Sequence, residues 1–418
     1  MVGCGFAGLK FVKRIDSDLY QVVLLDRRNY HTFQPLLYQV ASSGLEPDSI
    51  VYPIRKIFKD KKNFYFRMAD TREIDQDNKE VITSIGNIRY DILVIATGAK
   101  SNFFGMRDIE KYAMPMKEVV EALNLRSLII QNFEEALNTN DLKVRERLMN
   151  FIIVGGGPTG VELAGALSEL KAHVLPKDYP DLDIRRMQIH IIESNEQVLS
   201  AMSDVASEKA EKYLKKRDVN LWLGRRVSQY DGTTVIAGDK QFETKTLIWA
   251  AGIKGEFPAG IRGAHIARGN RIQVDQWNRV SGDGDIYAIG DVACINSERY
   301  PEGNAMLASV AEQQGAHLAR TLNRKALGKE IKPFAYEDKG TMATIGRNHA
   351  IVDMPKLKIG GTLGWFIWMF VHLMLLVDFR NRLIVFSNWA WSYINYDKGT
   401  RVIIRRFHKS DPGEAPET

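Results

Sequence analysis

Cysteine is nearly absent from this sequence. Its 418 residues contain only Cys4 and Cys294, and two cysteines so far apart build neither a disulfide framework nor a zinc site. They form no Cys-x-x-Cys pair, which excludes the redox-active dithiol that disulfide reductases use. So little cysteine is typical of a reducing compartment, and we predict no bound metal.

Two other signals are missing. No basic run has the density that nucleic-acid binding requires, although the net charge is +6 and the pI about 9.0. The first residues lack the basic region and apolar run of a secretory signal peptide. The composition, 45% hydrophobic and 26% charged, is that of a globular protein, and the length is sufficient for two or three domains.

What the sequence does contain is two glycine-rich dinucleotide fingerprints. They are Gly3-Cys4-Gly5-Phe6-Ala7-Gly8 and Gly155-Gly156-Gly157-Pro158-Thr159-Gly160. The second lies between an apolar strand, 151–154, and a helical stretch, 161–167. Such glycines let the backbone approach a pyrophosphate, which the helix N-terminal amides bind. Two fingerprints predict two dinucleotides bound face to face, as in an enzyme that moves electrons between a nicotinamide and a flavin.

The first fingerprint starts unusually early. Only Met1 and Val2 precede Gly3, whereas this motif ordinarily follows a whole buried strand at the centre of the sheet. We therefore expect three or four further apolar residues upstream of Met1 in the native chain.

An acid at the end of a strand is expected to hold the ribose of each nucleotide. Asp26 ends the strand 21–25 and follows Gly8 by 18 positions, close to the ~20 typical of this role. Glu193 ends the strand 188–192, beyond an apparent insertion at 171–186. A carboxylate there accepts from the ribose diol and repels a 2′-phosphate, which predicts NADH over NADPH. The alternative is a solvated acid at a strand end.

Small-residue turns end further strands and let the chain pass close to a cofactor. They are Ala96-Thr97-Gly98, Ala251-Gly252 and Gly290-Asp291. Because the last of them returns to the first nucleotide fold, the pattern predicts an α/β protein of two interleaved Rossmann-like domains. We place an FAD-binding domain at 1–115 and 276–354, an NADH-binding domain at 116–275 and a C-terminal membrane-associating module at 355–418.

The C-terminal module contains an uncharged run, 359–377, that is long enough to span a bilayer. Its glycine-rich opening is poor helix material, and its histidine and tryptophans favour a segment lying in the membrane interface. Basic residues flank the aromatic stretch 389–393, as suits an anionic bilayer: Arg380, Arg382, Arg401, Arg405, Arg406 and Lys409. A buried helix at a dimer interface and a true span are the alternatives. The tail 410–418 is expected to be disordered.

These motifs resemble the FAD/NAD-dependent flavoprotein reductases, and the finer pattern is similar to the type II (alternative, non-pumping) NADH:quinone oxidoreductases. The resemblance rests on both fingerprints and on residues 29–41, 308–315 and 339–347, and it covers nearly the whole chain. It implies hydride transfer from NADH to FAD and delivery of two electrons to a membrane quinone, without proton pumping. It also implies a homodimer on the cytoplasmic face of the cell (inner) membrane.

The resemblance also implies roles for single residues. Gly290-Asp291 would hold the ribityl and pyrophosphate region of FAD. Glu162 would tune the nicotinamide–flavin contact, unless it is only an acid favoured by the helix dipole. The amides of Gln313 and Gln314 would bond a flavin edge or a quinone carbonyl. Further candidates are Lys339, which would place charge near the reduced flavin or be a surface lysine, and His31 and Tyr38.

One position departs from the family pattern: Ser309 stands where many members have a glutamine near the quinone head group. Two rival functions share the fingerprints, a soluble NADH-dependent reductase of an iron–sulfur protein and a nucleotide-responsive flavoprotein sensor with slow turnover. A sulfide:quinone reductase is disfavoured because the chain lacks its set of cysteines.

Overall fold

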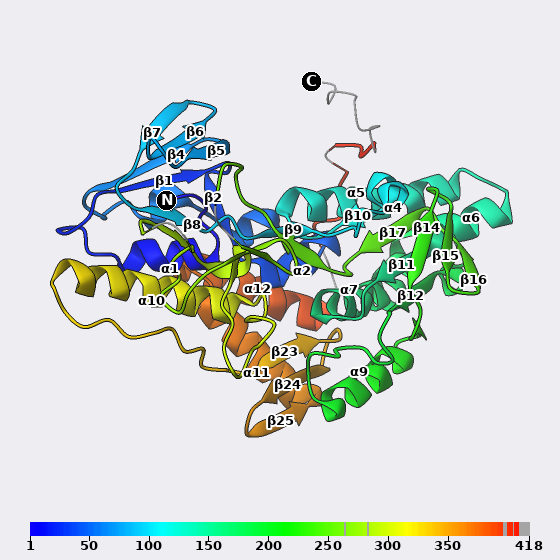
Figure 1. The fold of residues 1–418 in the computed structure, drawn as a ribbon. Helices are drawn as coiled ribbons and strands as arrows, with labels where there is room; N and C mark the ends of the chain where they lie inside the picture. Colours follow the sequence, from blue (N-terminus) through cyan, green and yellow to red (C-terminus); the bar gives the residue numbers. More distant parts are fainter. Residues whose placement is uncertain (263–264, 282–283, 396–398, 404, 409–418) are drawn as a thin grey trace. The chain divides into compact units, whose positions relative to one another are not determined.

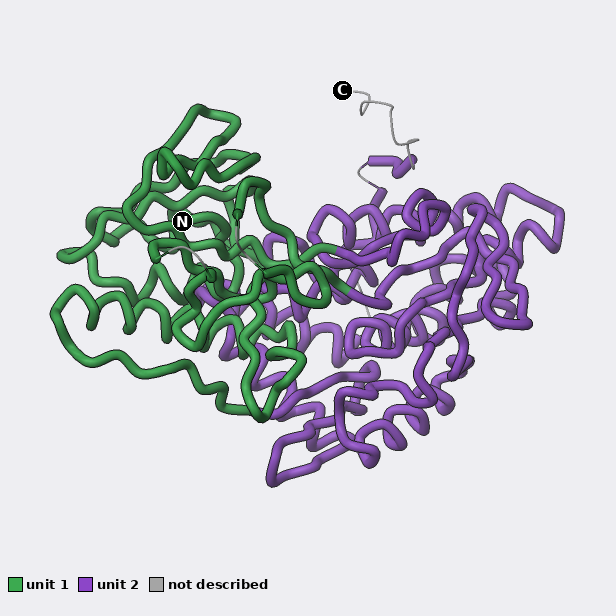
Figure 2. The backbone as a smooth tube through the Cα atoms, viewed as in Figure 1, with its two compact units in different colours: residues 1–32, 51–100, 253–338 green, residues 33–50, 101–252, 339–418 purple. Residues whose placement is uncertain are grey.

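The computed structural model describes residues 1–262, 265–281, 284–395, 399–403 and 405–408. The chain divides into two units, each discontinuous in sequence (Figure 2). Unit 1 comprises Met1–Thr32, Val51–Lys100 and Ile253–Asp338, and unit 2 comprises Phe33–Ile50, Ser101–Gly252 and Lys339–Thr418. The predicted interleaving is thereby confirmed. The bounds of the nucleotide domains stay a prediction, because these units group residues by packing, and the tail 410–418 lies outside the described residues.

A parallel sheet forms the centre of unit 1. Its strands are β1 Val22–Asp26, β4 Phe64–Met68 and β8 Leu93–Ile95, which are labelled in Figure 1, and β21 Ile286–Ala288. β1 pairs with β4, β8 pairs with β21, and Val2 bridges Leu25 and Ile95 in parallel. Val2 therefore occupies the central strand position, directly before the first fingerprint. Helix α1 Phe6–Arg14 follows and packs on α10 Ala308–Ala326.

Unit 2 repeats this strand order in a five-stranded parallel sheet. In spatial order the strands are β10 Met114–Pro115, β17 Thr246–Trp249, β11 Asn150–Val154, β12 Gln188–Ile192 and β13 Val219–Trp222. β11 is buried from Phe151 onward, as expected of a parallel strand covered on both faces. Through the second fingerprint it leads into helix α7 Pro158–Glu169. Further helices of this part include α4 Arg107–Tyr112, α5 Val119–Leu137, α6 Leu142–Met149 and α9 Asp204–Lys216.

Each unit also carries a three-stranded antiparallel meander. In unit 1 it is β5 Thr71–Asp75, β6 Glu80–Thr83 and β7 Gly86–Arg89; in unit 2 it is β14 Val227–Tyr230, β15 Thr234–Ala237 and β16 Lys240–Glu243. Each meander is followed by the strand that ends in a small-residue turn, β8 or β17. The two nucleotide folds therefore share one topology. The predicted insertion in the second contains a π-helical turn Leu170–Val174, helix α8 Leu175–Asp178 and a 3-10 turn Ile184–Arg186.

The C-terminal part of unit 2 contains a small antiparallel sheet and two helices. They are β23 Thr341–Thr344, β24 Ala350–Met354, β25 Leu357–Gly360, α11 Gly361–Leu375 and α12 Phe379–Asn395. The expectation that the glycines would resist helix formation is wrong, since α11 begins at Gly361. Gly364 lets the helix pack closely on β24, because a Cβ there would lie 3.0 Å from the Ala350 carbonyl oxygen. Within the described residues, no helix combines the length and apolarity needed to cross a membrane.

The segment Phe33–Ile50 packs with these elements in unit 2. It contains a 3-10 turn Gln34–Leu36, helix α2 Leu37–Ala41 and a 3-10 turn Pro47–Ser49. α2 contacts α5 and α7. Asn381 of α12 is buried and donates to the carbonyls of Asp48 at 3.0 Å and Ser49 at 3.1 Å. The C-terminal helices are therefore fixed to the fold by specific bonds.

Candidate functional site

The three glycines of the first fingerprint have three different environments. Gly3 has φ +95°, and a Cβ on it would lie 2.3 Å from the Ala96 carbonyl oxygen. A Cβ on Gly8 would lie 2.2 Å from the Gly3 carbonyl oxygen, so this glycine allows helix and strand to pack. A Cβ on Gly5 would meet no atom within 4 Å. Two glycines are thus required by the fold, and Gly5 leaves open space where a pyrophosphate fits.

The second fingerprint repeats this division. Gly155 has φ +109° and would clash with the Ala250 carbonyl oxygen, and Gly160 would clash with the Gly155 carbonyl oxygen at 2.0 Å. Gly157 again faces open space. It is the N-cap of α7, with Pro158 at the first helical position, so the amides of the first turn are available to a phosphate. The residues of both fingerprints therefore fit a dinucleotide.

The two strand-end acids also occupy equivalent positions. Asp26 accepts from the backbone N–H of Cys4 at 2.7 Å and of Arg28 at 2.8 Å. Glu193 accepts from the N–H of Gly156 at 2.6 Å and of Asn195 at 2.8 Å. Burial raises the pKa of Asp26, and these backbone N–H bonds oppose that rise. Both acids thus brace the glycine turns, and carboxylate oxygens have lone pairs left for a ribose hydroxyl.

Gln314 lies beside the Gly290-Asp291 turn. Its Oε1 accepts from the Gly290 N–H at 2.6 Å, and Gly290, with φ +78°, approaches Ala7 of the first fingerprint. The Nε2 of Gln314 is buried and has no partner among the described residues. A buried free donor at this turn fits a carbonyl group of a bound cofactor. The structure therefore brings Gln314, Gly290 and the first fingerprint together.

The other residues that the sequence singled out around Gln314 and the first fingerprint either bond other parts of the chain or are exposed. Gln313 donates to the Glu337 carbonyl at 2.9 Å and accepts from the Glu337 N–H at 3.0 Å, so both ends of its amide bind backbone. The hydroxyl of Ser309 lies 3.0 Å from that of Tyr336. Lys339 is exposed. His31 is buried, and its Nδ1 lies 2.8 Å from the Cys4 carbonyl oxygen, so it supports the glycine turn. Catalytic roles for Gln313 and Lys339 stay predictions.

The turns Ala96-Thr97-Gly98 and Ala251-Gly252 follow β8 and β17, each beside its own fingerprint. Gly98 has φ +76°, and the Thr97 hydroxyl donates to the Glu256 carbonyl. A Cβ on Gly252 would lie 3.0 Å from the ring of Phe104. Both turns therefore depend on small residues, as the sequence predicts.

Glu162 lies on α7 in unit 2 and is 7% exposed. Burial raises the pKa of this carboxyl well above its ordinary value, and the Thr344 N–H, 3.4 Å from Oε1, and the nearby Trp368 indole oppose the rise. Burial, and then the proximity of Glu162, also raise the pKa of the Tyr38 hydroxyl. Burial therefore favours the protonated form of both groups within unit 2.

A cavity of about 80 Å³ lies beside this pair, within unit 2. Its walls come from the 33–50 segment, α7, the β23–β24 turn, α11 and α12. In one wall Gln39 donates to the Tyr38 hydroxyl at 2.8 Å and accepts from the Trp389 indole at 2.8 Å. No pattern in the sequence indicates this cavity. The dense aromatic and amide groups of 29–41 indicated a site, but nothing indicated its contact with Trp389, which lies 350 residues from Gln39.

Comparisons with known proteins agree with this geometry. Residues 1–315 match the pyridine nucleotide-disulphide oxidoreductase family, and residues 339–395 match the NDH2 C-terminal domain. The type II NADH:quinone oxidoreductase NdhA of Mycobacterium tuberculosis is 31% identical over 96% of this chain and 88% of its own length. The chain belongs to the type II NADH:quinone oxidoreductases.

Further relatives extend this family assignment. An internal alternative NAD(P)H-ubiquinone oxidoreductase of Arabidopsis thaliana is 32% identical over 94% of this chain and 83% of its own length. The structure of NDH2 from Plasmodium falciparum in complex with NADH superposes with a TM-score of 0.88, at 21% identity, over 97% of this chain and 99% of that one. At that identity the superposition shows the fold alone. As a type II NADH:quinone oxidoreductase, the chain is a flavoprotein NADH dehydrogenase that uses FAD and NADH.

Proposed function

We propose that this chain binds FAD at the first fingerprint and NADH at the second, and reduces a quinone of the bilayer on which it lies. The observation that carries the proposal is the pair of fingerprints in which the middle glycine alone faces open space. When bound, FAD supplies the two-electron exchange between the nicotinamide and the quinone. The chain itself binds and orients FAD and NADH and supplies protons to the quinone.

The residues of each nucleotide site have distinct tasks in this proposal. Asp26 orients the ribose of FAD, and the free Nε2 of Gln314 donates to a flavin carbonyl. Glu193 accepts from the ribose of NADH, and its charge disfavours a 2′-phosphate. We propose that the turns Ala96-Thr97-Gly98, Ala251-Gly252 and Gly290-Asp291 let the chain pass close to the bound nucleotides.

Quinone reduction needs two protons, and the cavity in unit 2 is where we propose they are supplied. Burial raises the pKa of the Glu162 carboxyl and of the Tyr38 hydroxyl, which favours the protonated form of each. Tyr38 lines the cavity, so its hydroxyl can donate to a quinone oxygen there and be reprotonated afterwards. Gln39 orients the Tyr38 hydroxyl by donating to its oxygen.

Exposed apolar side chains on α11 and α12 support a membrane-bound enzyme. The most exposed are Leu363, Phe370, Phe379, Trp391 and Ile394, each more than 60% exposed. Exposed apolar side chains of this kind, with exposed Arg380 next to Phe379 in the chain, suit the interface of an anionic bilayer. We propose peripheral attachment to the cytoplasmic face of the cell (inner) membrane, and a homodimer as the assembled form.

One assay tests the function. The purified protein, loaded with FAD, is given NADH with and without a short-chain quinone in detergent, and absorbance at 340 nm is followed. We expect rapid oxidation that depends on the quinone. Flavin reduction without quinone turnover would keep both nucleotide sites but refute the quinone as acceptor, and would favour an iron–sulfur protein partner. Turnover no faster than the background reaction of the flavin with oxygen would favour a sensor.

A further inference from the structure

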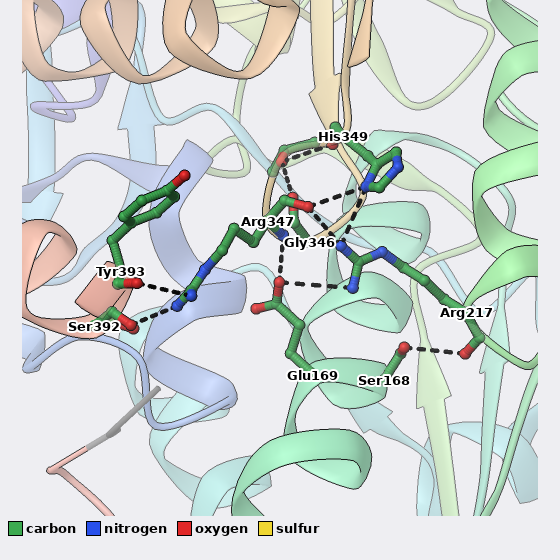
Figure 3. Close-up of polar contacts among 9 residues, drawn as sticks. Ser168, Glu169, Arg217, Gly346, Arg347, His349, Ser392 and Tyr393 are labelled. Atoms are coloured by element: carbon green, nitrogen blue, oxygen red, sulfur yellow. Dashed lines mark hydrogen bonds and ion pairs between the residues drawn. The ribbon is translucent and has the colours of Figure 1, made fainter. Parts of the chain in front are cut away.

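Arg347 joins two helices of unit 2 that are far apart in sequence (Figure 3). Its backbone N–H donates to the Glu169 carboxylate, at the end of α7. Its guanidinium donates to the carbonyl of Tyr393 at 2.9 Å and to that of Ser392. The guanidinium also lies over the Tyr393 ring, 4.9 Å from its centroid. The fingerprint helix and the last turn of α12 are therefore tied through one residue.

The two carbonyls are groups that a helix leaves unsatisfied. Within the described residues α12 ends at Asn395, so Ser392 and Tyr393 lie in its last described turn, where the carbonyls have no described partner within the helix. A cation at that end also complements the helix dipole. Arg347 thus caps α12 with a planar, two-pronged donor, which a lysine reproduces only in part.

The residue is held as firmly on its other side. Arg217 pairs with Glu169 at 3.7 Å and donates to the Arg347 carbonyl at 2.6 Å, and Ser168 donates to the Arg217 carbonyl at 3.0 Å. The side chains of Glu169 and Arg217 are only 17% and 16% exposed. In such a setting an ion pair is screened far less than at the surface.

Two glycines make this junction sterically feasible. Gly346 has φ +68°, and a Cβ on it would lie 2.7 Å from both the guanidinium carbon of Arg217 and a carboxylate oxygen of Glu169. A Cβ on Gly165 of α7 would lie 2.6 Å from the Gly346 nitrogen. The backbone at these two positions is therefore shaped so that Arg347 approaches α7 closely.

Arg347 and the residues to which it donates hydrogen bonds also line the cavity. Glu169, Arg347, Ser392 and Tyr393 all line it, and Tyr38 belongs to the same lining. About 80 Å³ is a small volume, equal to the share of liquid volume of roughly two or three waters. A small displacement of the last turn of α12 changes that volume by a large fraction.

We propose that Arg347 is a positioning residue for the quinone: it fixes the last turn of α12 against α7 and so sets the shape of the cavity that receives a quinone carbonyl oxygen. This inference rests on the proposed function. Arg347 acts through the position of α12, whereas the nicotinamide half of the reaction depends on the fingerprint at the opposite end of α7.

The test separates the two half-reactions. In Arg347→Gln we expect kcat/KM for a short-chain quinone to fall about tenfold or more, since both charge-assisted bonds to α12 are lost. The rate of anaerobic flavin reduction by NADH should stay unchanged. Arg347→Lys should recover part of the quinone kcat/KM. Arg186→Gln is the matched control, because Arg186 bonds Glu146 at the surface of the same unit, away from this cavity.

Either of two results would overturn the inference: an equal fall of both half-reactions, or a quinone kcat/KM that Arg347→Gln leaves at the wild-type value. A wild-type protein without quinone turnover would instead refute the proposed function. If Arg347→Gln does not fold, Glu169→Gln provides the test, because a glutamine oxygen still accepts from the Arg347 N–H while the pairing with Arg217 loses its charge. It should lower quinone kcat/KM selectively, and an unchanged value would count against the inference.

Discussion

The middle and last glycines of the second fingerprint should respond oppositely to the same substitution. Gly157→Ala adds a Cβ that meets no atom of the chain within 4 Å, and its φ of −72° is one that alanine adopts freely. Gly160→Ala adds a Cβ that lies 2.0 Å from the Gly155 carbonyl oxygen. The first change should therefore affect only the ligand, and the second should affect the fold.

Magnitudes follow from these distances. For Gly157→Ala, a less favourable helix N-cap costs about 1 kcal/mol, and the stiffer unfolded chain offsets about 0.4–1 kcal/mol, so stability hardly changes. The added methyl fills the space of the pyrophosphate, and we expect the Kd of the dinucleotide to rise at least about 100-fold, roughly 2.7 kcal/mol. Overpacking at Gly160 costs about 1–3 kcal/mol, which lowers Tm by roughly 2–12 °C.

ADP-ribose is a suitable probe, because it carries the pyrophosphate but no nicotinamide and cannot reduce the flavin. Its Kd is measured by isothermal titration, and Tm by calorimetry of the FAD-loaded protein. Wild-type affinity in Gly157→Ala would mean that no pyrophosphate lies at Gly157, and the reasoning from open space would fail. A wild-type Tm in Gly160→Ala would show that the helix and strand are not as close as described.

Three further predictions concern charge, pH and lipid. Glu193→Gln keeps one acceptor oxygen for the Gly156 N–H of the glycine turn but removes the charge that repels a 2′-phosphate. The ratio of NADPH to NADH kcat/KM should therefore rise about tenfold, and an unchanged ratio would refute the assignment. Burial raises the pKa of Glu162, so its folded form binds the proton more tightly, and stability is lost as pH rises above the ordinary value of 4.5. Glu162→Gln should therefore raise Tm at pH 8 and not at pH 4, and equal gains at both would contradict this. The double variant Phe370→Glu, Leu383→Glu changes side chains that are 65% and 52% exposed, and it should abolish pelleting with anionic vesicles. The control Met68→Glu changes a side chain of unit 1 that is 59% exposed, and it should pellet as the wild type does. Persistent pelleting of the double variant would place the anchor elsewhere.

The nucleotide folds were readable in the sequence because their constraints are local. Three glycines at fixed spacing, a preceding apolar run and an acid at the end of the next strand together specify a strand, a turn and a helix. The predicted strand 151–154 and helix start at 161 lie within β11 and α7. The sequence also indicated Gln314 as a candidate for flavin binding. That its Nε2 has no partner among the described residues could be seen only in the structure, where its Oε1 accepts from the Gly290 N–H.

The cavity was not readable, because its walls depend on residues that meet only in three dimensions. Glu169 and Arg347 are 178 residues apart, and although Arg347 ends the stretch 339–347, no pattern in the sequence pairs it with Glu169. The helical start of α11 was misjudged for a related reason: glycine is a poor helix former by propensity, but Gly364 is selected by close packing on β24. Helix propensity describes an isolated segment, whereas the start of α11 is determined by its tertiary contact with β24.

The strand order of unit 1 has a consequence for how the protein is made. β8 receives its outer partner β21 only after the ribosome has added the residues from 96 to 285, which takes roughly 10–40 s at typical elongation rates. The five strands of the unit 2 sheet lie between 114 and 249, so they emerge complete during this interval. The sheet encoded second therefore closes first, and the bare edge of β8 is the part of the nascent chain most in need of a chaperone.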